Sequence, residues 1–199
     1  MIHEFWFGTL DARGRVASDR SERWFTVDPE FDREVRIHFE SDLRTAAAGR
    51  RVRWEDDPRG VLALVLLFDQ FPRNTYRGTP RAFVFDAHAY RCMEQAVSRG
   101  LDKQLWPVER AFLNMPLLHS EDVAAQEQAV ERFAELADAA DGGQQDLFGE
   151  FTRKAREHRE IIRTFARFPY RNDILGRESS AAERAFLAKG GGRQLGVGD

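Results

Sequence analysis

Residues 58–74, PRGVLALVLLFDQFPRN, contain the longest apolar run of the chain and end in a polar motif. The run from Val61 to Phe68 is far shorter than the roughly 20 residues that a membrane-spanning helix needs. From Pro58 to about Gln70 the segment is apolar on nearly every side, which is typical of a helix surrounded by other helices. We therefore predict that this helix lies at the centre of an all-α fold.

Prolines indicate where several other helices begin. Proline is favoured at the first position of a helix because its missing N–H would have no partner there. Such starts are the pairs Asp28-Pro29, Asp57-Pro58, Thr79-Pro80 and Trp106-Pro107. With a capping box from Ser180 to Glu183, the apolar spacing predicts helices over residues 29–49, 58–70, 80–99, 107–117, 120–140, 145–167 and 180–189. Short connections favour antiparallel neighbours, so we predict a compact array of helical hairpins with about eight helices.

The composition indicates one globular domain and argues against certain classes of partner. We expect a single all-helical domain over residues 1–189 and a disordered glycine-rich tail over 190–199. The net charge of -3 argues against binding to nucleic acid or to a membrane surface. Cys92 is the single cysteine and the first residues do not resemble a secretory signal, so we expect a cytoplasmic location. No glycine-rich phosphate loop or dinucleotide motif is present, and we predict no cofactor.

One motif occurs twice, as FDQFPRN at residues 68–74 and as FARFPYRN at residues 165–172. The favoured interpretation is structural: proline ends a helix, asparagine tolerates a left-handed turn, and arginine bonds the last carbonyls. Alternatively, guanidinium groups from both copies converge on a phosphate or carboxylate ligand. The residues of this hypothesis are Arg73, Asn74, Arg77, Arg171, Asn172 and Arg177.

A second polar cluster combines residues 119–122 with a histidine on a later apolar stripe. The favoured interpretation places Glu121 and Asp122 in the first turn of a helix and His158 as a hydrogen-bonded core residue. The alternative is an acid–base site of His119, Glu121 and His158, or a metal site of His119, Asp122 and His158. Because no metal-binding histidine spacing is present, we predict no metal.

A third set consists of Asp69, Gln70 and Asp86, of which the two aspartates are expected to face inward. A buried carboxylate must find a partner or become neutral. The simplest partners are the guanidinium groups of Arg73, Arg77 and Arg171. The resulting network either joins two helical hairpins or lines a ligand pocket.

Four stretches together resemble the signatures of the bacterial domain-of-unknown-function family 924. They are FWFG at residues 5–8, DQFPRN at 69–74, PLLHSED at 116–122 and RFPYRNDILGR at 167–177. The resemblance covers nearly the whole chain and implies a helical fold of tetratricopeptide-like type, without an established activity. One departure is Ala166, where the pattern is expected to have glycine.

Two functions therefore stay open. The favoured one is a helical binding or scaffold module, as the tetratricopeptide-like resemblance suggests, whose concave face grips a peptide or another protein. The alternative is a protein that binds a small anionic ligand, or a hydrolase-like enzyme with an Arg/His/Asp pocket. The sequence predicts no oligomeric state.

Overall fold

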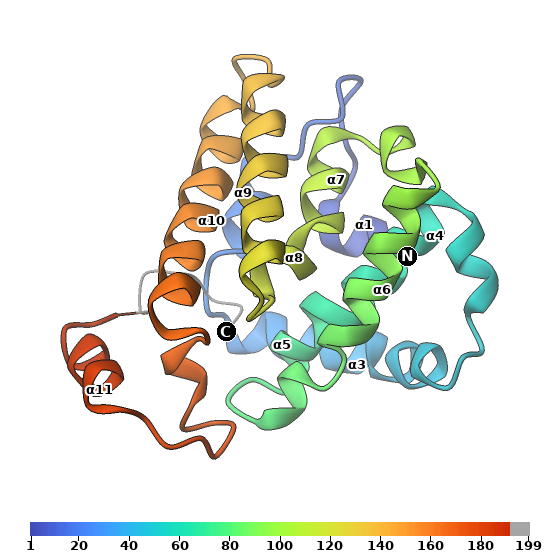
Figure 1. Cartoon of the computed structure of the whole chain (residues 1–199). Helices are drawn as coiled ribbons and strands as arrows, with labels where there is room; N and C mark the ends of the chain where they lie inside the picture. The colour runs from blue at the N-terminus through green and yellow to red at the C-terminus, as the bar shows by residue number, and fades with distance from the viewer. Residues whose placement is uncertain (192–199) are drawn as a thin grey trace.

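The computed structural model describes residues 1–191 and contains no strand within them, which confirms the predicted all-α class (Figure 1). Its α-helices are α1 (Ile2–Phe7), α2 (Ser18–Arg23), α3 (Pro29–Ala47), α4 (Pro58–Val65), α5 (Phe71–Thr75), α6 (Asp86–Ser98), α7 (Pro107–Leu113), α8 (Met115–His119), α9 (Val123–Asp138), α10 (Gln145–Phe165) and α11 (Ala181–Ala188). Short 3-10 helices are η1 (Val52–Asp56), η3 (Pro80–Phe83), η4 (Leu101–Gln104) and η5 (Pro169–Arg171). A π-helical turn, η2 (Leu66–Gln70), joins α4 to α5.

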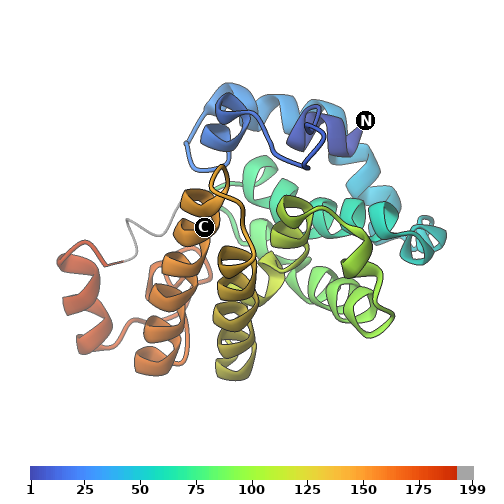
Figure 2. The same cartoon turned by 90° about the horizontal axis from the view of Figure 1, so that it is seen from above.

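The apolar run lies at the centre of the fold, as predicted. Every residue from Val61 to Phe68 is at most 5% exposed. α4 is packed against α6, and α5 against α3. In Figure 2 the N-terminal helices lie along one side of the molecule and the α9–α10 pair along another.

The first proline motif does not end its helix, so this part of the prediction is wrong. Pro72 has no N–H to give to the carbonyl of Phe68, and its ring would crowd that carbonyl in a regular α-helix. The chain instead widens into the π turn, in which the Phe71 N–H donates to the Leu66 carbonyl. The helix then continues to Thr75, with Asn74 inside it rather than in a left-handed turn.

The predicted helices over 80–99 and 107–117 are each divided in two. The first consists of η3 followed by α6, which begins at Asp86. The second breaks at Asn114 because Pro116 cannot continue the hydrogen-bond ladder of α7, and α8 follows. The start predicted at Ser120 lies later, because the Asp122 side chain accepts the Ala125 N–H and caps α9.

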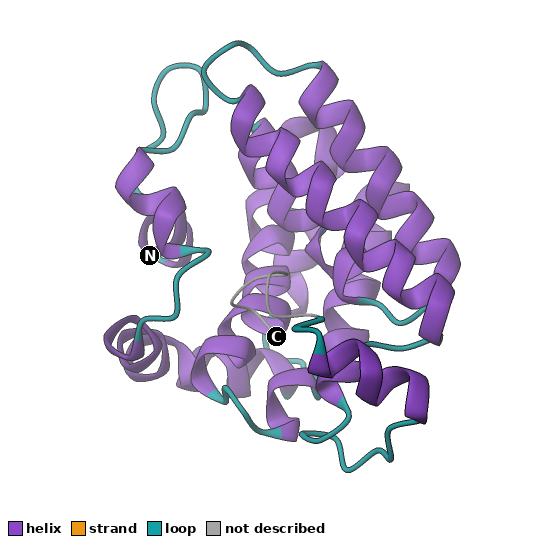
Figure 3. Ribbon diagram, turned by 90° about the vertical axis from the view of Figure 1, so that its left-hand side faces the viewer, coloured by secondary structure: helices purple, strands orange, loops and turns teal. Residues whose placement is uncertain are grey.

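The C-terminal third consists of the long α9–α10 hairpin and the short α11, seen from another side in Figure 3. α10 ends at Ala166, whose φ of 57° is left-handed. The predicted capping box of α11 is confirmed, with Ser180 and Glu183 bonding each other's backbone N–H. Of the predicted tail, Gly190 and Gly191 form the terminal turn of α11, and residues 192–199 lie outside the described residues. Within residues 1–191, no helix is both long and apolar enough to cross a membrane.

Candidate functional site

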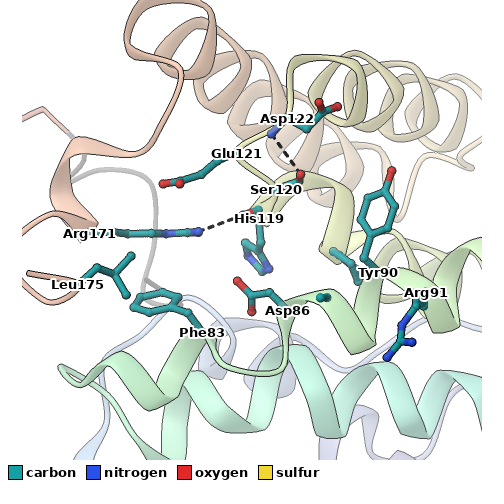
Figure 4. A pocket seen from close by; sticks show the side chains of 12 residues that line it. Phe83, Asp86, Tyr90, Arg91, His119, Ser120, Glu121, Asp122, Arg171 and Leu175 are labelled. Carbon is teal, nitrogen blue, oxygen red and sulfur yellow. Dashed lines mark hydrogen bonds between the residues drawn. The ribbon is translucent and has the colours of Figure 1, made fainter. Parts of the chain in front are cut away.

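A cavity of about 610 Å³ opens between the start of α6, the end of α8 and the segment around η5 (Figure 4). This volume lies within the range of roughly 300 to 1,000 Å³ that small-molecule sites occupy. The lining residues are Phe83, Asp86, Ala87, Tyr90, Arg91, Pro116, His119, Ser120, Glu121, Asp122, Arg171 and Leu175. Three of the predicted site clusters therefore contribute to one cavity.

His119, the last residue of α8, is held by a buried carboxylate. Its Nδ1 lies 2.7 Å from Oδ1 of Asp69, whose side chain is fully buried in the π turn. Burial by itself raises the pKa of Asp69, but the charge and hydrogen bond of His119 and the charge of Arg73 lower it to about 2. Since Asp69 is ionised and only accepts, the His119 Nδ1 carries the shared proton. In the neutral ring, Nε2 is then the basic nitrogen.

Arg73 connects this pair to a second carboxylate. Its Nη2 donates to Asp69 Oδ1 at 3.2 Å and to Asp86 Oδ1 at 3.0 Å, and its side chain is 1% exposed. Burial raises the pKa of Asp86, and the charge of Asp69 acts in the same direction while that of Arg73 opposes it. The two aspartates on one guanidinium thus have pKa values displaced in opposite directions. Such a pair is typical of acid–base sites.

Arg171, from the second copy of the motif, lies on the wall of the cavity. Its Nη1 donates to the carbonyl of His119 at 3.0 Å, which caps the end of α8. Its guanidinium lies over the rings of Phe83 and Phe168, with centroid distances of 4.9 and 4.4 Å. Because the side chain is buried between two rings, its orientation is fixed and its positive charge faces a poorly solvated wall.

The remaining polar residues of the first motif face another part of the molecule. Asn74 Nδ2 donates to Asp32 Oδ1 at 2.7 Å, and Arg77 forms a bidentate pair with the same carboxylate at 2.7 and 2.9 Å. Neither residue lines the cavity. They join the end of α5 to α3, in keeping with the structural interpretation. Gln70 lies nearer to the His119–Asp69 pair, because its side-chain Nε2 donates to Asp69 Oδ2 at 2.6 Å.

In the second copy, too, the asparagine and the following arginine lie outside the cavity lining. Asn172 is in a right-handed conformation, contrary to the predicted left-handed turn, and its Nδ2 donates to Ser179 and Glu183. Arg177 bonds Glu121 at 2.6 and 2.9 Å. Neither Asn172 nor Arg177 lines the cavity.

Of the predicted metal and acid–base cluster, His119, Glu121 and Asp122 line the cavity, and His158 lies apart from them. Glu121 precedes the helix cap instead of lying in the first turn of α9, and it also accepts the Phe168 N–H at 2.8 Å. His158 is 1% exposed, and its Nδ1 lies 3.2 Å from the Leu118 carbonyl, as expected for a core histidine. It does not line the cavity with His119 and Asp122. Within residues 1–191 no group of three histidine, cysteine or acidic side chains could hold a metal.

Sequence reasoning missed several lining residues, chiefly Phe83, Tyr90 and Leu175. Phe83 and Tyr90 both fall within the helix predicted over 80–99, whereas the structure places Phe83 in η3 and Tyr90 in α6, and both line the cavity. Leu175 follows η5 in a turn, where no periodic pattern exists. Burial raises the pKa of Cys92 to about 11, so this thiol is no nucleophile.

The comparisons with known proteins agree with the four motifs. The family model described as "Bacterial protein of unknown function (DUF924)" matches residues 2–191. A solved structure of a protein of unknown function from Agrobacterium tumefaciens is 34% identical, with a TM-score of 0.77 over 94% of this chain and 95% of that one. No curated protein matches the chain. The chain therefore belongs to the bacterial family of unknown function DUF924.

Proposed function

We propose that the cavity binds a small organic molecule that carries an oxyanion, and that His119 exchanges a proton with this molecule. The observation that carries the proposal is the buried hydrogen bond from His119 to Asp69, on the wall of a cavity of ligand size. A buried carboxylate that fixes the tautomer of a histidine leaves the other ring nitrogen as the base. A histidine with only a packing role would not need this arrangement.

The expected chemistry follows from the charges around the ring. When Nε2 accepts a proton from the bound molecule or from water, the ring becomes an imidazolium, which the ionised Asp69 stabilises. Arg171 places a second positive charge on the same wall, because it bonds the carbonyl of His119 itself. An oxyanion bound between the imidazolium of His119 and the guanidinium of Arg171 is stabilised by both positive charges.

The scaffold function stays a prediction. A large contiguous apolar patch on the surface would mark a site for docking a protein. Among the described residues, the large exposed apolar side chains instead come from separate elements: Met1, Val27, Ile37, Val52, Val84, Trp106 and Val123. No specific observation therefore favours the scaffold function over the binding of a small molecule in the cavity.

A thermal-shift assay tests the small-molecule function. Benzoate and phenyl phosphate should raise the melting temperature, whereas neutral benzamide should not. At a ligand concentration of about ten times Kd, binding to the native state is worth about 1.4 kcal/mol, or roughly 3 to 6 °C for a chain of this size. Absence of any shift with both anions at millimolar concentration would contradict the proposal.

Two variants with matched controls locate the binding. His119→Asn keeps a donor near the position of Nδ1 for Asp69 but removes Nε2, and Arg171→Gln removes the charge but keeps a donor for the His119 carbonyl. Each should weaken benzoate binding at least tenfold, as expected for loss of a charged hydrogen bond. The controls His38→Asn and Arg77→Gln change the same residue types outside the cavity lining and should bind like the unmodified chain. Equal binding by all four variants would place the anion elsewhere.

A further inference from the structure

The cavity is lined by both charged and apolar side chains, and this combination indicates which class of molecule the cavity accepts. In Figure 4, Arg171, Glu121, His119 and Asp86 form the charged part of the lining, with Phe83 and Leu175 on one side of His119 and Tyr90 on the other. The apolar and aromatic lining residues are Phe83, Ala87, Tyr90, Pro116 and Leu175. A ligand that matched only the charged part would leave much of this apolar wall in contact with water.

The position of Phe83 is fixed by the two arginines of the repeated motif. The guanidinium of Arg73 lies 5.5 Å from the centroid of its ring, and that of Arg171 lies 4.9 Å from it. Leu175 lies beside the same ring in the close-up view. An apolar surface therefore begins directly beside the positive charge of Arg171. A ligand anion at Arg171 would have its carbon atoms against this surface.

The acidic residues of the lining limit how many negative charges the ligand carries. Asp86 is paired with Arg73, Glu121 with Arg177, and Asp122 with the N-terminus of α9. These carboxylates are held in place by their partners and do not turn away from a ligand. Arg91, which also lines the cavity, lies on the opposite side from Arg171 in Figure 4, so a second anionic group near the first would lie close to one of these carboxylates and be repelled. The lining thus suits one negative charge.

We infer that the ligand of the cavity is a monoanionic amphiphile, with a single carboxylate group on an apolar body of medium size. This inference rests on the proposed function and specifies its substrate class. The anionic group lies at His119 and Arg171, and the apolar body lies along Phe83 and Leu175. Dicarboxylates and nucleotides, which carry several negative charges, are excluded by the three carboxylates of the lining.

Calorimetric titration of the full chain with a homologous series tests the inference. From acetate through butyrate to hexanoate, affinity should rise by about fourfold for each methylene that leaves water. Adipate, which has the length of hexanoate and a second carboxylate, should bind at least tenfold more weakly, and neutral hexanol should not bind measurably. Hexyl phosphate, which carries roughly -1.5 to -2 charges at pH 7, should also bind more weakly than hexanoate.

The outcomes separate this inference from the function on which it rests. If acetate or inorganic phosphate binds as tightly as hexanoate, or adipate binds better, the amphiphile is wrong while the oxyanion site stands. If no anion binds, both are wrong. These results require no variant.

Leu175→Ala provides a second measurement, with circular dichroism to verify the fold. It should weaken hexanoate about tenfold and leave acetate unchanged, since it removes apolar contact alone. Its matched control Ile174→Ala, next to it but outside the lining, should leave the chain-length dependence intact. An unchanged hexanoate affinity in a folded Leu175→Ala variant would remove Leu175 from the binding surface and overturn the proposed placement of the apolar body.

Discussion

The two copies of the aromatic-proline-arginine-asparagine motif have the same residue types and opposite surroundings. In the first copy, Arg73 bonds two carboxylates, Asp69 and Asp86, and the helix runs on through a π turn. In the second copy, Arg171 bonds a backbone carbonyl and lies between two aromatic rings, after α10 has ended at Ala166. Both guanidinium groups nevertheless face the ring of Phe83.

This difference separates a structural role from a binding role. The buried Asp69 and the partly exposed Asp86 hold the charge of Arg73 within the protein, so the first copy stabilises the fold and orients His119 through Asp69. Arg171 is oriented by rings and a carbonyl on the cavity wall, so in our proposal the second copy holds the ligand. In both copies the asparagine and the following arginine lie outside the lining and bond acidic partners: Asp32 in the first copy, and Glu183 and Glu121 in the second. A repeated motif therefore does not imply a repeated function.

Replacing Arg73 should cause the greatest loss of stability. Arg73→Ala leaves Asp69 buried without one of its positive partners, and breaking a buried ion pair costs about 3 to 5 kcal/mol. Urea unfolding, followed by circular dichroism, measures this loss. The control Arg77→Ala breaks a partly exposed pair with Asp32 and should cost about 1 kcal/mol. Equal losses from the two variants would mean that Arg73 has no special structural role.

The two aspartates of the first copy should respond to acid in opposite ways. Asp69 has a lowered pKa, so its contribution is present above its unfolded pKa of 3.8 and is lost as the pH falls toward about 2. This loss amounts to about 2 kcal/mol. Asp86 has a raised pKa, so its charge opposes folding at neutral pH and that opposition disappears in acid.

Unfolding free energies between about pH 2 and pH 7 in two variants test these signs. Asp69→Asn should be less stable at neutral pH and should lose about 2 kcal/mol less than the unmodified chain on acidification. Asp86→Asn should keep the acid sensitivity of the unmodified chain or increase it slightly. A variant Asp69→Asn as acid-sensitive as the unmodified chain would contradict the ionised, buried carboxylate.

Replacing Ala166 should give a smaller, favourable change in the second copy. A left-handed conformation costs an L-residue roughly 1 to 2 kcal/mol, and glycine avoids this cost. Ala166→Gly should therefore raise the unfolding free energy by about 1 kcal/mol. The control Ala139→Gly, at the end of α9 with φ of -86°, should be neutral or destabilising. Destabilisation by Ala166→Gly alone would indicate that the methyl group makes a contact of its own.

The sequence predicts much of this fold because its signals are local. The apolar run from Val61 to Phe68 indicates its burial, and proline pairs and capping residues indicate the helix starts. The inward position of Asp69 follows from the same periodicity, since it ends the most apolar helix. His158 follows its stripe into the core as well.

Which residues of each motif face the cavity depends on three-dimensional packing that no local sequence pattern shows. The π turn at Leu66–Gln70 changes which direction Arg73 and Asn74 face, and Pro72 by itself predicts an end or a kink of the helix as readily as a π turn. Phe83 and Leu175 belong to short or irregular segments, so periodicity gives no sign of where they point. The cavity itself arises from the packing of α6, α8 and η5, which are far apart in the chain.

Nitrogen-15 NMR of the histidine rings in the unliganded protein tests whether Asp69 makes His119 a base that faces the cavity. When its ring is neutral, His119 should carry its proton on Nδ1, and Asp69→Asn should abolish that preference, because the ionised carboxylate is its cause. A proton on Nε2 in the neutral ring, or the same tautomer in the presence and absence of the Asp69 carboxylate, would contradict the proposed role of this pair.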